Sequence, residues 1–484
     1  MKVCFVTSEC VPFVKTGGLA DVSGALPKAL AKLGCEVKVF LPLYGSINTK
    51  DHGLIFAHEL YDVPVQMGNK TARFHVWYKK DADSGVEYYF IENSAYYHRS
   101  QIYTSDRDED ERFILLQNAV LLILQRYNWA PDILQCNDWQ TALLPVYLKE
   151  KFAWDGLFAK TASVLSIHNL GYQGRFSRGT IYTAGLSFDK YYPVGPYEFH
   201  GSFSFLKVGI LYAEMITTVS ETYAWEIQTP EYGAGMDGVL AMRRDSLFGI
   251  LNGSDSHDWN PRTDRFIPHH YDIDDLSPKL QNKKALLDYF RMPFDENVPT
   301  IGMIMRLTPQ KGVELLPQVF HEIMRLPVQL VVLGSGEKKY EDFFRWAAYE
   351  YPNQVSAYFG FNNPLAHLIT AGCDMFLMPS RYEPCGLNQM YSLNYGTVPL
   401  VRKTGGLADT VHDYDEFNGE GNGFSFYDFT PYALWSTIER AQNLFHQKEV
   451  WREIVQRGMA ADFSWEASAR KYLEVYKKAK MRRG

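Results

Sequence analysis

Short apolar runs alternate with longer amphipathic segments through the first half of the chain. KVCFVT at residues 2–7 and EVKVFLP at residues 36–42 are rich in β-branched and aromatic residues, which favours buried strands. Residues 19–33, between them, repeat apolar positions at helical spacing. The same alternation predicts strands at 74–79, 86–92, 132–137, 163–168, 215–220 and 247–252, and helices at 111–126 and 139–149. Because helices separate most of these strands, we predict parallel βαβ units, with 74–79 and 86–92 as candidates for an antiparallel pair.

The second half of the chain repeats this pattern. The predicted strands are 298–305, 328–334, 355–360, 374–379 and 397–401, the predicted helices are 312–324 and 337–349, and the chain reads as helical from Pro431 onward. The polar, proline-containing stretch at 260–278 is the candidate linker. Ligands of doubly wound α/β sheets bind outside the carboxyl ends of the strands. The cleft between two such domains is therefore the predicted site.

Composition and charge narrow the class of protein. The chain has 484 residues, 46% of them hydrophobic, which fits a folded protein of more than one domain. A net charge of −7 leaves no electrostatic footprint for nucleic acid or an anionic membrane. The six cysteines are scattered without a CxxC pair, and neither a targeting segment nor an apolar stretch of membrane-spanning length is found. We expect a cytoplasmic protein without a metal, and the sequence does not predict its oligomeric state.

The heptad KTGGLAD occurs twice, at 15–21 and at 403–409. Each copy follows a predicted strand and precedes a helical start. Paired glycines there let the backbone approach a ligand, while a helix N-terminus and a lysine favour an anion. One such string would more simply be a tight turn. Two identical ones favour an anion site.

Further charged and polar residues follow other predicted strands. Arg306 and Lys311 lie in RLTPQKG, where a guanidinium and an ammonium suit phosphate oxygens. The other strand-end candidates are Asp138, His168, Asn252, Asp255 and Glu383. Each alone reads as a cap or turn residue. Together they suit the transfer of a group from a diphosphate, with cations holding the leaving charge.

The chain resembles a known family, that of bacterial glycogen synthases and plant starch synthases. The signatures run in order along the chain: SECVPFVKTGGLADV (8–22), NDWQTALLP (137–145), SIHNLGYQG (166–174), TTVSETYA (217–224), LNGSDSHDWNP (251–261), RLTPQKG (306–312), PSRYEPCGLNQMYSLNYG (379–396) and VRKTGGLADTV (401–411). The resemblance implies an α/β GT-B fold of two Rossmann-like domains facing a cleft, at 1–262 and 263–464, with a C-terminal helix at 465–484 returning to the first. It implies transfer of α-glucose from ADP-glucose or UDP-glucose, ADP-glucose being favoured, to the non-reducing end of an α-1,4-glucan.

The resemblance also implies roles for individual residues. The catalytic set is Glu383, His168, Lys311, Arg306 and Asp138. The substrate-binding set is Lys15, Gly17, Gly18, Asp21, Tyr97, Asn252, Asp255, Phe361, Cys385, Gly386, Leu387, Thr404, Gly405, Gly406 and Leu407. Among these, Gly405, Gly406 and Leu407 are expected to offer amides to the phosphate, Phe361 to stack on the base, and Tyr97, with Arg99, to border the site. No cofactor is implied.

The chain departs from the family pattern at several positions. Asn137 and Gln140 stand where many relatives have His, Ser254 where Ile is usual, and Met305 where a small residue precedes the arginine. Tyr391 occupies the place of a second Glu that grips the ribose in many related glycosyltransferases. These differences bear on donor preference and rate.

Alternatives to this function and mechanism stay open at the level of sequence. The resemblance also implies that the configuration at the anomeric carbon is retained, which fits either same-face attack or double displacement. The richness in cations on the leaving-group side favours same-face attack. The rival classes are a transferase of the same fold with another sugar or acceptor, a nicotinamide-dependent oxidoreductase and an inactive glucan-binding module. The stretch GSGEKKY at 334–340 lacks the third glycine of the dinucleotide fingerprint, which disfavours the oxidoreductase.

Overall fold

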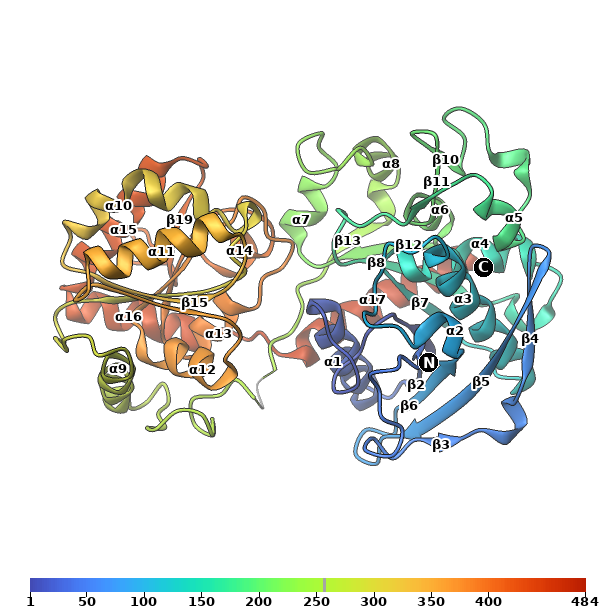
Figure 1. Ribbon diagram of the computed structural model, residues 1–484, viewed down its shortest axis with the longest axis horizontal. Coiled ribbons are helices and arrows are strands. Elements are labelled where there is room, and N and C mark those ends of the chain that lie inside the picture. Colours follow the sequence, from blue (N-terminus) through green and yellow to red (C-terminus); the bar gives the residue numbers. More distant parts are fainter. Residues whose placement is uncertain (256–257) are drawn as a thin grey trace. The chain divides into compact units, whose positions relative to one another are not determined.

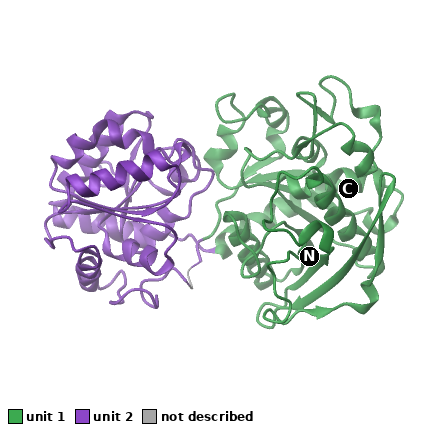
Figure 2. Cartoon of the chain, viewed as in Figure 1, with its two compact units in different colours: residues 1–253, 465–484 green, residues 254–464 purple. Residues whose placement is uncertain are grey.

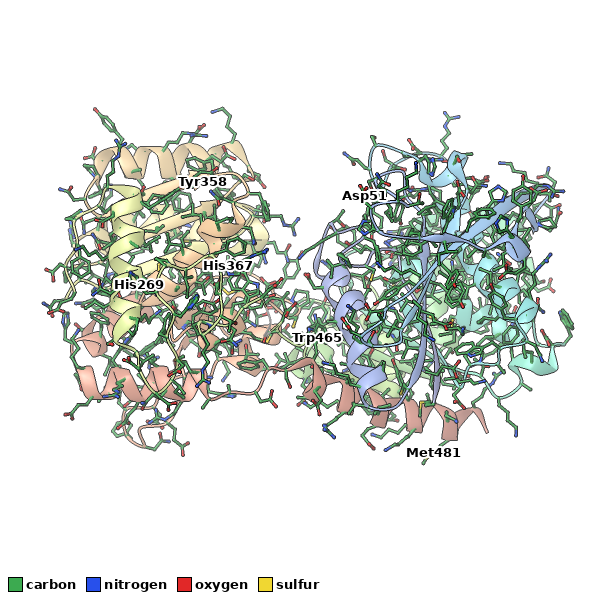
Figure 3. The ribbon with its side chains drawn as sticks, turned by 90° about the horizontal axis from the view of Figure 1, so that it is seen from below. Asp51, His269, Tyr358, His367, Trp465 and Met481 are labelled. Atoms are coloured by element: carbon green, nitrogen blue, oxygen red, sulfur yellow. The ribbon has the colours of Figure 1, made fainter. Side chains whose placement is uncertain are left out.

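The protein divides into two compact units in a computed structural model that describes residues 1–255 and 258–484. Unit 1 comprises Met1–Gly253 and Trp465–Gly484, and unit 2 comprises Ser254–Ser464 (Figure 2). The second unit thus begins at Ser254, whereas we expected a boundary after residue 262. The segment before residue 262 packs on unit 2: the Trp259 ring lies 3.8 Å from that of His367, a residue labelled in Figure 3.

Unit 1 is built on a mostly parallel sheet with the strand order β13-β12-β8-β7-β1-β2-β6-β5-β3, to which β4 is added beside β5 (Figure 1). Its strands are β1 (Lys2–Val6), β2 (Glu36–Pro42), β3 (Ile55–Phe56), β4 (Val63–Met67), β5 (Lys70–Lys80), β6 (Glu87–Glu92), β7 (Ile133–Asn137), β8 (Ala162–Ile167), β12 (Met215–Thr218) and β13 (Leu247–Gly249). Strands β1, β7 and β8 are buried along almost their whole length, as continuous apolar runs predict. The candidate antiparallel pair is confirmed, because β5 runs antiparallel to β6.

Helices and a small second sheet complete unit 1. The helices are α1 (Gly18–Lys32), α2 (Ser94–Tyr97), α3 (Glu109–Arg126), α4 (Leu144–Val146), α5 (Thr180–Ala184), α6 (Phe205–Tyr212), α7 (Glu221–Glu226), α8 (Asp237–Met242) and α17 (Trp465–Arg483). Strands β9 (Arg175–Phe176), β10 (Glu198–Phe199) and β11 (Ser202–Ser204) form the small antiparallel sheet. Helix α17, which carries Trp465 and Met481 of Figure 3, packs on α1 and on β8.

Unit 2 contains a six-stranded, wholly parallel sheet in the order β16-β15-β14-β17-β18-β19. The strands are β14 (Thr300–Ile304), β15 (Gln329–Gly334), β16 (Val355–Phe359), β17 (Met375–Met378), β18 (Val398–Arg402) and β19 (Phe424–Phe426). The helices are α9 (Ser277–Phe290), α10 (Leu316–Met324), α11 (Lys338–Glu350), α12 (Asn363–Gly372), α13 (Asn388–Asn394), α14 (Gly405–Thr410), α15 (Pro431–Phe445) and α16 (Lys448–Met459).

Alternate side chains of this sheet enter different cores. Leu330 and Val332 of β15 join the cluster formed with α10, α11 and α15, whereas Val331 and Leu333 pack with α9 and α12. This alternation follows from the two-residue period of a strand and places helices on both faces of the sheet (Figure 1).

Each large sheet has a point at which its strand order reverses. In unit 1 the chain leaves β1 for β2 on one side, and β7 is on the other side of β1. In unit 2 the strands β15 and β16 extend to one side of β14, and β17 begins the other side. The loops that follow strands flanking such a point diverge and leave room for a ligand. The loops after β1, β7, β14 and β17 carry nine of the twenty predicted site residues, among them Asp138, Lys311 and Glu383.

Three predicted elements differ from the structure. The predicted helix at 139–149 is broken into a 3₁₀ turn at Trp139–Thr141, the short α4 and a π-helical turn at Tyr147–Lys151. Pro145 lies in this stretch and lacks the N–H that a continuous helix requires. The C-terminal region forms three helices with breaks at residues 446–447 and 460–464. The predicted linker at 260–278 lies inside unit 2, and α9 begins within it at Ser277. In the described residues no helix is both long and apolar enough to span a bilayer.

Candidate active site

A short ion pair joins two loops at the carboxyl edge of the unit 2 sheet. Lys311 Nζ lies 2.5 Å from Glu383 Oε2, and the Ser380 hydroxyl donates to the same oxygen at 3.1 Å. The two charged side chains are only 17% and 10% exposed. A pair so shielded from solvent interacts more strongly than one at the surface. The structure therefore brings together two of the predicted catalytic residues.

The loop after β14 places Lys311 against the loop after β17. Lys311 ends a 3₁₀ turn at Pro309–Lys311, and Gly312 follows with a φ of +71°. A Cβ on Gly312 would lie 1.9 Å from the Pro379 carbonyl oxygen, so only glycine allows this approach. The Arg381 N–H donates to the Gln310 carbonyl at 2.9 Å and joins the same two loops.

The glycines of the second KTGGLAD string are required by packing within unit 2. Gly405 has a φ of +45°, and a Cβ there would lie 2.0 Å from the Glu383 carbonyl oxygen. A Cβ on Gly406 would lie 2.0 Å from the Cys385 carbonyl oxygen. The Gly406 N–H donates to the Glu383 carbonyl at 3.2 Å, and the Leu407 N–H donates to the Thr404 carbonyl at 3.1 Å. The amides of Gly406 and Leu407, expected to be open to phosphate, are thus engaged within the chain, and their binding of a donor stays a prediction.

The rest of the loop after β17 is held from α13. Gly386 has a φ of +72°, and the buried Gln389 side chain donates to the carbonyls of Cys385 and Gly386. Cys385 is buried, and Leu387 is the residue directly before α13. These contacts fix the backbone on the C-terminal side of Glu383.

Arg306 and Phe361 are exposed at the carboxyl edge of the same sheet. Arg306 follows β14 and makes no ion pair within the described part of the chain. Gly334 and Gly336 of the GSGE stretch pack against this loop, since a Cβ on either would lie 2.0 or 2.2 Å from the carbonyl oxygens of Met305 and Leu307. Phe361 follows β16 and is 91% exposed. Both side chains are available to a ligand.

In unit 1, Asp138 has a strained backbone directly after β7. Its φ of +56° and ψ of −172° lie in a region that glycine alone adopts readily. Asp138 Oδ1 accepts the His168 N–H at 2.7 Å, which ties it to the end of β8. Burial raises the pKa of the Asp138 carboxyl to about 7, against the lowering effect of the His168 N–H, and the nearby Glu9 adds to the rise. A carboxyl that titrates near neutrality at a strained strand end is typical of a functional residue.

Two buried polar atoms at this edge of the sheet have no hydrogen-bond partner among residues 1–255 and 258–484. They are His168 Nδ1 and Asn252 Oδ1. The other ring nitrogen of His168, Nε2, lies 3.0 Å from Asn137 Oδ1. Burial lowers the pKa of the His168 imidazole to about 4, so the ring is neutral at pH 7. Buried acceptors without partners are unusual in a folded chain and are suited to the hydroxyl groups of a ligand.

The glycines of the first KTGGLAD string, unlike those of the second, are not packed closely against other backbone atoms. Beyond its own chain neighbours, a Cβ on Gly17 or Gly18 would meet no atom of the described residues within 4 Å, and neither glycine has a positive φ. Lys15 is exposed and pairs with Asp21 of the same string at 2.7 Å. The space beside Gly17 and Gly18 is open to a ligand, whereas that beside Gly405 and Gly406 is filled by the protein.

The Glu9 side chain engages some of the backbone N–H groups that were expected to bind an anion. Glu9 Oε2 accepts the N–H of Thr16 at 2.6 Å and that of Gly17 at 3.1 Å. The Tyr103 hydroxyl donates to Glu9 Oε1 at 2.9 Å. Glu9 is buried, so its carboxylate is the anion that holds this loop. Its place after β1 is the signal that could have identified it from sequence.

Tyr97 requires a correction. Its side chain is fully buried, and its hydroxyl donates to the Arg112 carbonyl at 2.8 Å, so this ring belongs to the core and does not face a substrate. Arg99 is paired with Asp106 and Asp108. Asp255 is exposed at the start of unit 2, where its carboxylate accepts the Asp258 N–H at 3.3 Å.

Among residues 1–255 and 258–484, no group of three or more His, Cys, Asp or Glu side chains is arranged to hold a metal ion. The six cysteines are buried in the structure and are not joined in disulfide bonds.

Two doubly wound sheets, each with charged side chains and glycine turns at its carboxyl edge, are the architecture expected of a GT-B glycosyltransferase, and the comparisons with known proteins place the chain in that class. The starch synthase catalytic domain family matches residues 2–242, and the glycosyl transferases group 1 family matches residues 288–456. The chain belongs to the glycogen synthase and starch synthase family and is a glycosyltransferase that adds glucosyl units to a glucan.

Relatives match the chain over nearly its whole length. A glycogen synthase of Bacillus cereus is 46% identical over 477 residues, covering 99% of each chain. A glycogen synthase of Desulforudis audaxviator is 46% identical over 490 residues, covering 99% of this chain and 96% of the relative. The catalytic domain of starch synthase IV from Arabidopsis thaliana, solved with ADP and acarbose, has a TM-score of 0.88 and 31% identity, covering 99% of each chain.

Proposed function

We propose that this enzyme transfers α-glucose from ADP-glucose to the non-reducing end of an α-1,4-glucan, with retention of configuration at the anomeric carbon. The solved starch synthase IV is bound to ADP, and it resembles this chain over 99% of its length. That ligand supports an adenine nucleotide as the donor here. Acarbose in the same structure supports an oligosaccharide acceptor.

The Lys311–Glu383 pair is the observation that carries the proposed chemistry. A diphosphate that approaches the loop after β14 meets the exposed Arg306 and competes with Glu383 for the Lys311 ammonium group. The charge on the diphosphate grows as the glycosidic bond breaks, so both cations stabilise the transition state more than the ground state. Glu383, released in part from Lys311, then faces the positive charge that develops on the sugar ring.

The buried acceptors of unit 1 suit the transferred sugar. His168 Nδ1 and Asn252 Oδ1 each accept a hydrogen bond from a glucosyl hydroxyl in this proposal. Asp138, whose pKa is raised to about 7, provides a third polar group at the same edge. A sugar would thus satisfy two buried atoms that lack partners among the described residues and share the Asp138 carboxyl.

Other predicted residues serve the donor. Lys15 and the open backbone at Gly17 and Gly18 are adjacent to the diphosphate and sugar in this proposal, and Phe361 stacks on the base. We propose same-face attack, in which the leaving phosphate takes the proton of the acceptor hydroxyl as the new bond forms. Transfer by this route needs no metal. The cytoplasmic location and the independence from metal stay predictions.

Incorporation of labelled glucose into glycogen tests the proposal. Purified protein is given ADP-glucose or UDP-glucose with a glycogen primer and a chelator, and label in alcohol-insoluble polymer is followed. We expect ADP-glucose to be used with a higher kcat/KM than UDP-glucose. Preference for UDP-glucose would overturn the donor assignment, and no transfer from either would overturn the function.

Two further measurements test the linkage and the stereochemistry. Label at non-reducing ends is released as maltose by an exo-acting β-amylase. Nuclear magnetic resonance of the first product with a short maltooligosaccharide acceptor distinguishes an α from a β linkage. A β linkage would exclude retention.

A further inference from the structure

The orientation of the Asn137 side chain is determined by its two partners. Asn137 is buried at the end of β7. Its Nδ2 donates to the Val6 carbonyl of the neighbouring strand β1 at 2.8 Å. A carbonyl oxygen only accepts, so the amide nitrogen must face Val6. The amide oxygen, Oδ1, therefore faces His168 Nε2 at 3.0 Å.

This orientation determines which ring nitrogen of His168 carries the proton. Asn137 Oδ1 is an acceptor, so the nitrogen facing it must donate, and His168 Nε2 is protonated. The ring is neutral, because burial lowers the pKa of the imidazole to about 4. Nδ1 is then left with a free lone pair. It is buried and has no partner among the residues that the structure describes.

The His168 backbone is fixed as well as its ring. Its N–H donates to Asp138 Oδ1 at 2.7 Å, and Asp138 is the next residue after Asn137. Two successive residues, the last of β7 and the first after it, thus hold the side chain and the main chain of the residue that follows β8. The direction of the Nδ1 lone pair is set before any ligand arrives.

We propose that Asn137 is a positioning residue that holds His168 as the Nε2–H tautomer, so that Nδ1 accepts a hydrogen bond from one hydroxyl group of the transferred glucosyl unit. This inference rests on the proposed function, since the ligand is the donor sugar. The enzyme then selects for a sugar that donates a hydrogen bond at this position. An analogue of equal size that cannot donate is rejected, because it leaves Nδ1 unpaired.

Donor analogues distinguish an accepting from a donating ring nitrogen. The probes are ADP-glucose derivatives with hydrogen or fluorine in place of each sugar hydroxyl in turn; fluorine cannot donate a hydrogen bond. At one position we expect both analogues to lose about tenfold or more in kcat/KM with the wild-type enzyme. If no position shows this paired loss, or if the fluoro analogue is accepted where the deoxy analogue fails, the proposal is wrong.

Variants at position 137 connect that loss to the tautomer. N137L removes the acceptor for Nε2, so the loss at the sensitive position should shrink to within about threefold, while losses at other positions stay unchanged. N137D keeps an acceptor for Nε2 when its second carboxyl oxygen is protonated and donates to the Val6 carbonyl, and it should then recover the discrimination. N118L is the matched control, because Asn118 is another buried asparagine of unit 1 and its side chain donates within α3. Equal discrimination in N137L and wild type would overturn the proposal.

Nitrogen NMR of histidine-labelled protein identifies the His168 tautomer by a measurement that does not depend on enzyme activity. The His168 signals are assigned by their loss in H168Q, and the shifts distinguish protonated from unprotonated ring nitrogens. We expect protonated Nε2 and unprotonated Nδ1 in the wild type and N137D, and a changed pattern in N137L. A protonated Nδ1 in the wild type would overturn the inference even if neither ADP-glucose nor UDP-glucose were a donor.

Discussion

The ammonium group of Lys311 lies 2.5 Å from Glu383 Oε2, although 72 positions separate the two residues in sequence. The contact exists because β14 and β17 are adjacent parallel strands, whose following loops begin at the same edge of the sheet. Their charges are coupled before a donor binds, which determines how variants of the two should behave together.

Removing either charge should lower kcat. Removing both should lower kcat by a smaller factor than the product of the two single-variant factors. E383A is expected to lower kcat by about 10²-fold or more, and K311A should also act mainly on kcat. In the double variant neither charge is left unpaired, so the losses should not multiply. Initial rates for the four enzymes give the coupling. K338A, in an exposed pair with Asp342, is the control. A K311A effect confined to the acceptor KM would contradict this role.

The two glycine strings should respond oppositely to alanine. G405A and G406A force a Cβ to within 2.0 Å of the Glu383 or Cys385 carbonyl, so both should lower the Tm and the activity together. G17A and G18A enter open space and should leave the Tm within about 2 °C of wild type, while raising the donor KM. Thermal melts and donor titrations measure both. A stable, active G406A would show that the tight approach is not needed.

Replacing Glu9 by glutamine should weaken donor binding. The carboxylate accepts from two backbone N–H groups and from Tyr103, and a glutamine would turn an NH₂ group toward at least one of these donors. The loop should shift, and the donor KM should rise by about tenfold. E59Q, at an exposed carboxylate that accepts from the Tyr127 hydroxyl, is the matched control. An unchanged donor KM in E9Q would separate Glu9 from the donor.

The Asp138 carboxyl should make stability depend on pH. Its pKa is raised to about 7 in the folded state, so between its ordinary range and pH 7 the folded protein binds a proton that the unfolded chain has lost. Stability from this group therefore falls as the pH rises, by about 1.4 kcal/mol for each unit of the raised pKa. The Tm of D138N relative to wild type should be higher at pH 8 than at pH 5. A difference independent of pH would contradict the raised pKa.

Most strands of both sheets could be predicted because buried parallel strands are continuous apolar runs. The strands predicted at 2–7 and 298–305 contain the whole of β1 (Lys2–Val6) and of β14 (Thr300–Ile304). The helix predicted at 139–149 failed because apolar periodicity does not register the break near Pro145. Packing against neighbouring elements determines the local structure of this segment, and a single sequence does not reveal that packing.

The site could be predicted by position but not by partner. Strand-end placement identified Lys311, Glu383, Asp138 and His168, which all lie at the carboxyl edges of the sheets. It could not show that Glu9 takes the amides of the first string or that Gly406 donates to Glu383, because those bonds depend on how loops fold back. Tyr97 was misassigned for the same reason, because its ring turns into the core and its hydroxyl donates to the Arg112 carbonyl.

Helix α17 gives unit 1 an unusual order of assembly during synthesis. Unit 1 begins at Met1, yet its last helix, Trp465–Arg483, is translated after all of unit 2. Tyr472 and Tyr476 of that helix are buried in unit 1, so until they emerge from the ribosome part of its sheet and of α1 lacks a cover. Unit 2 is continuous in sequence and can complete its core first. Unit 1 is thus completed only after unit 2 has been translated, and removal of Trp465–Gly484 should send the chain to chaperones and proteases.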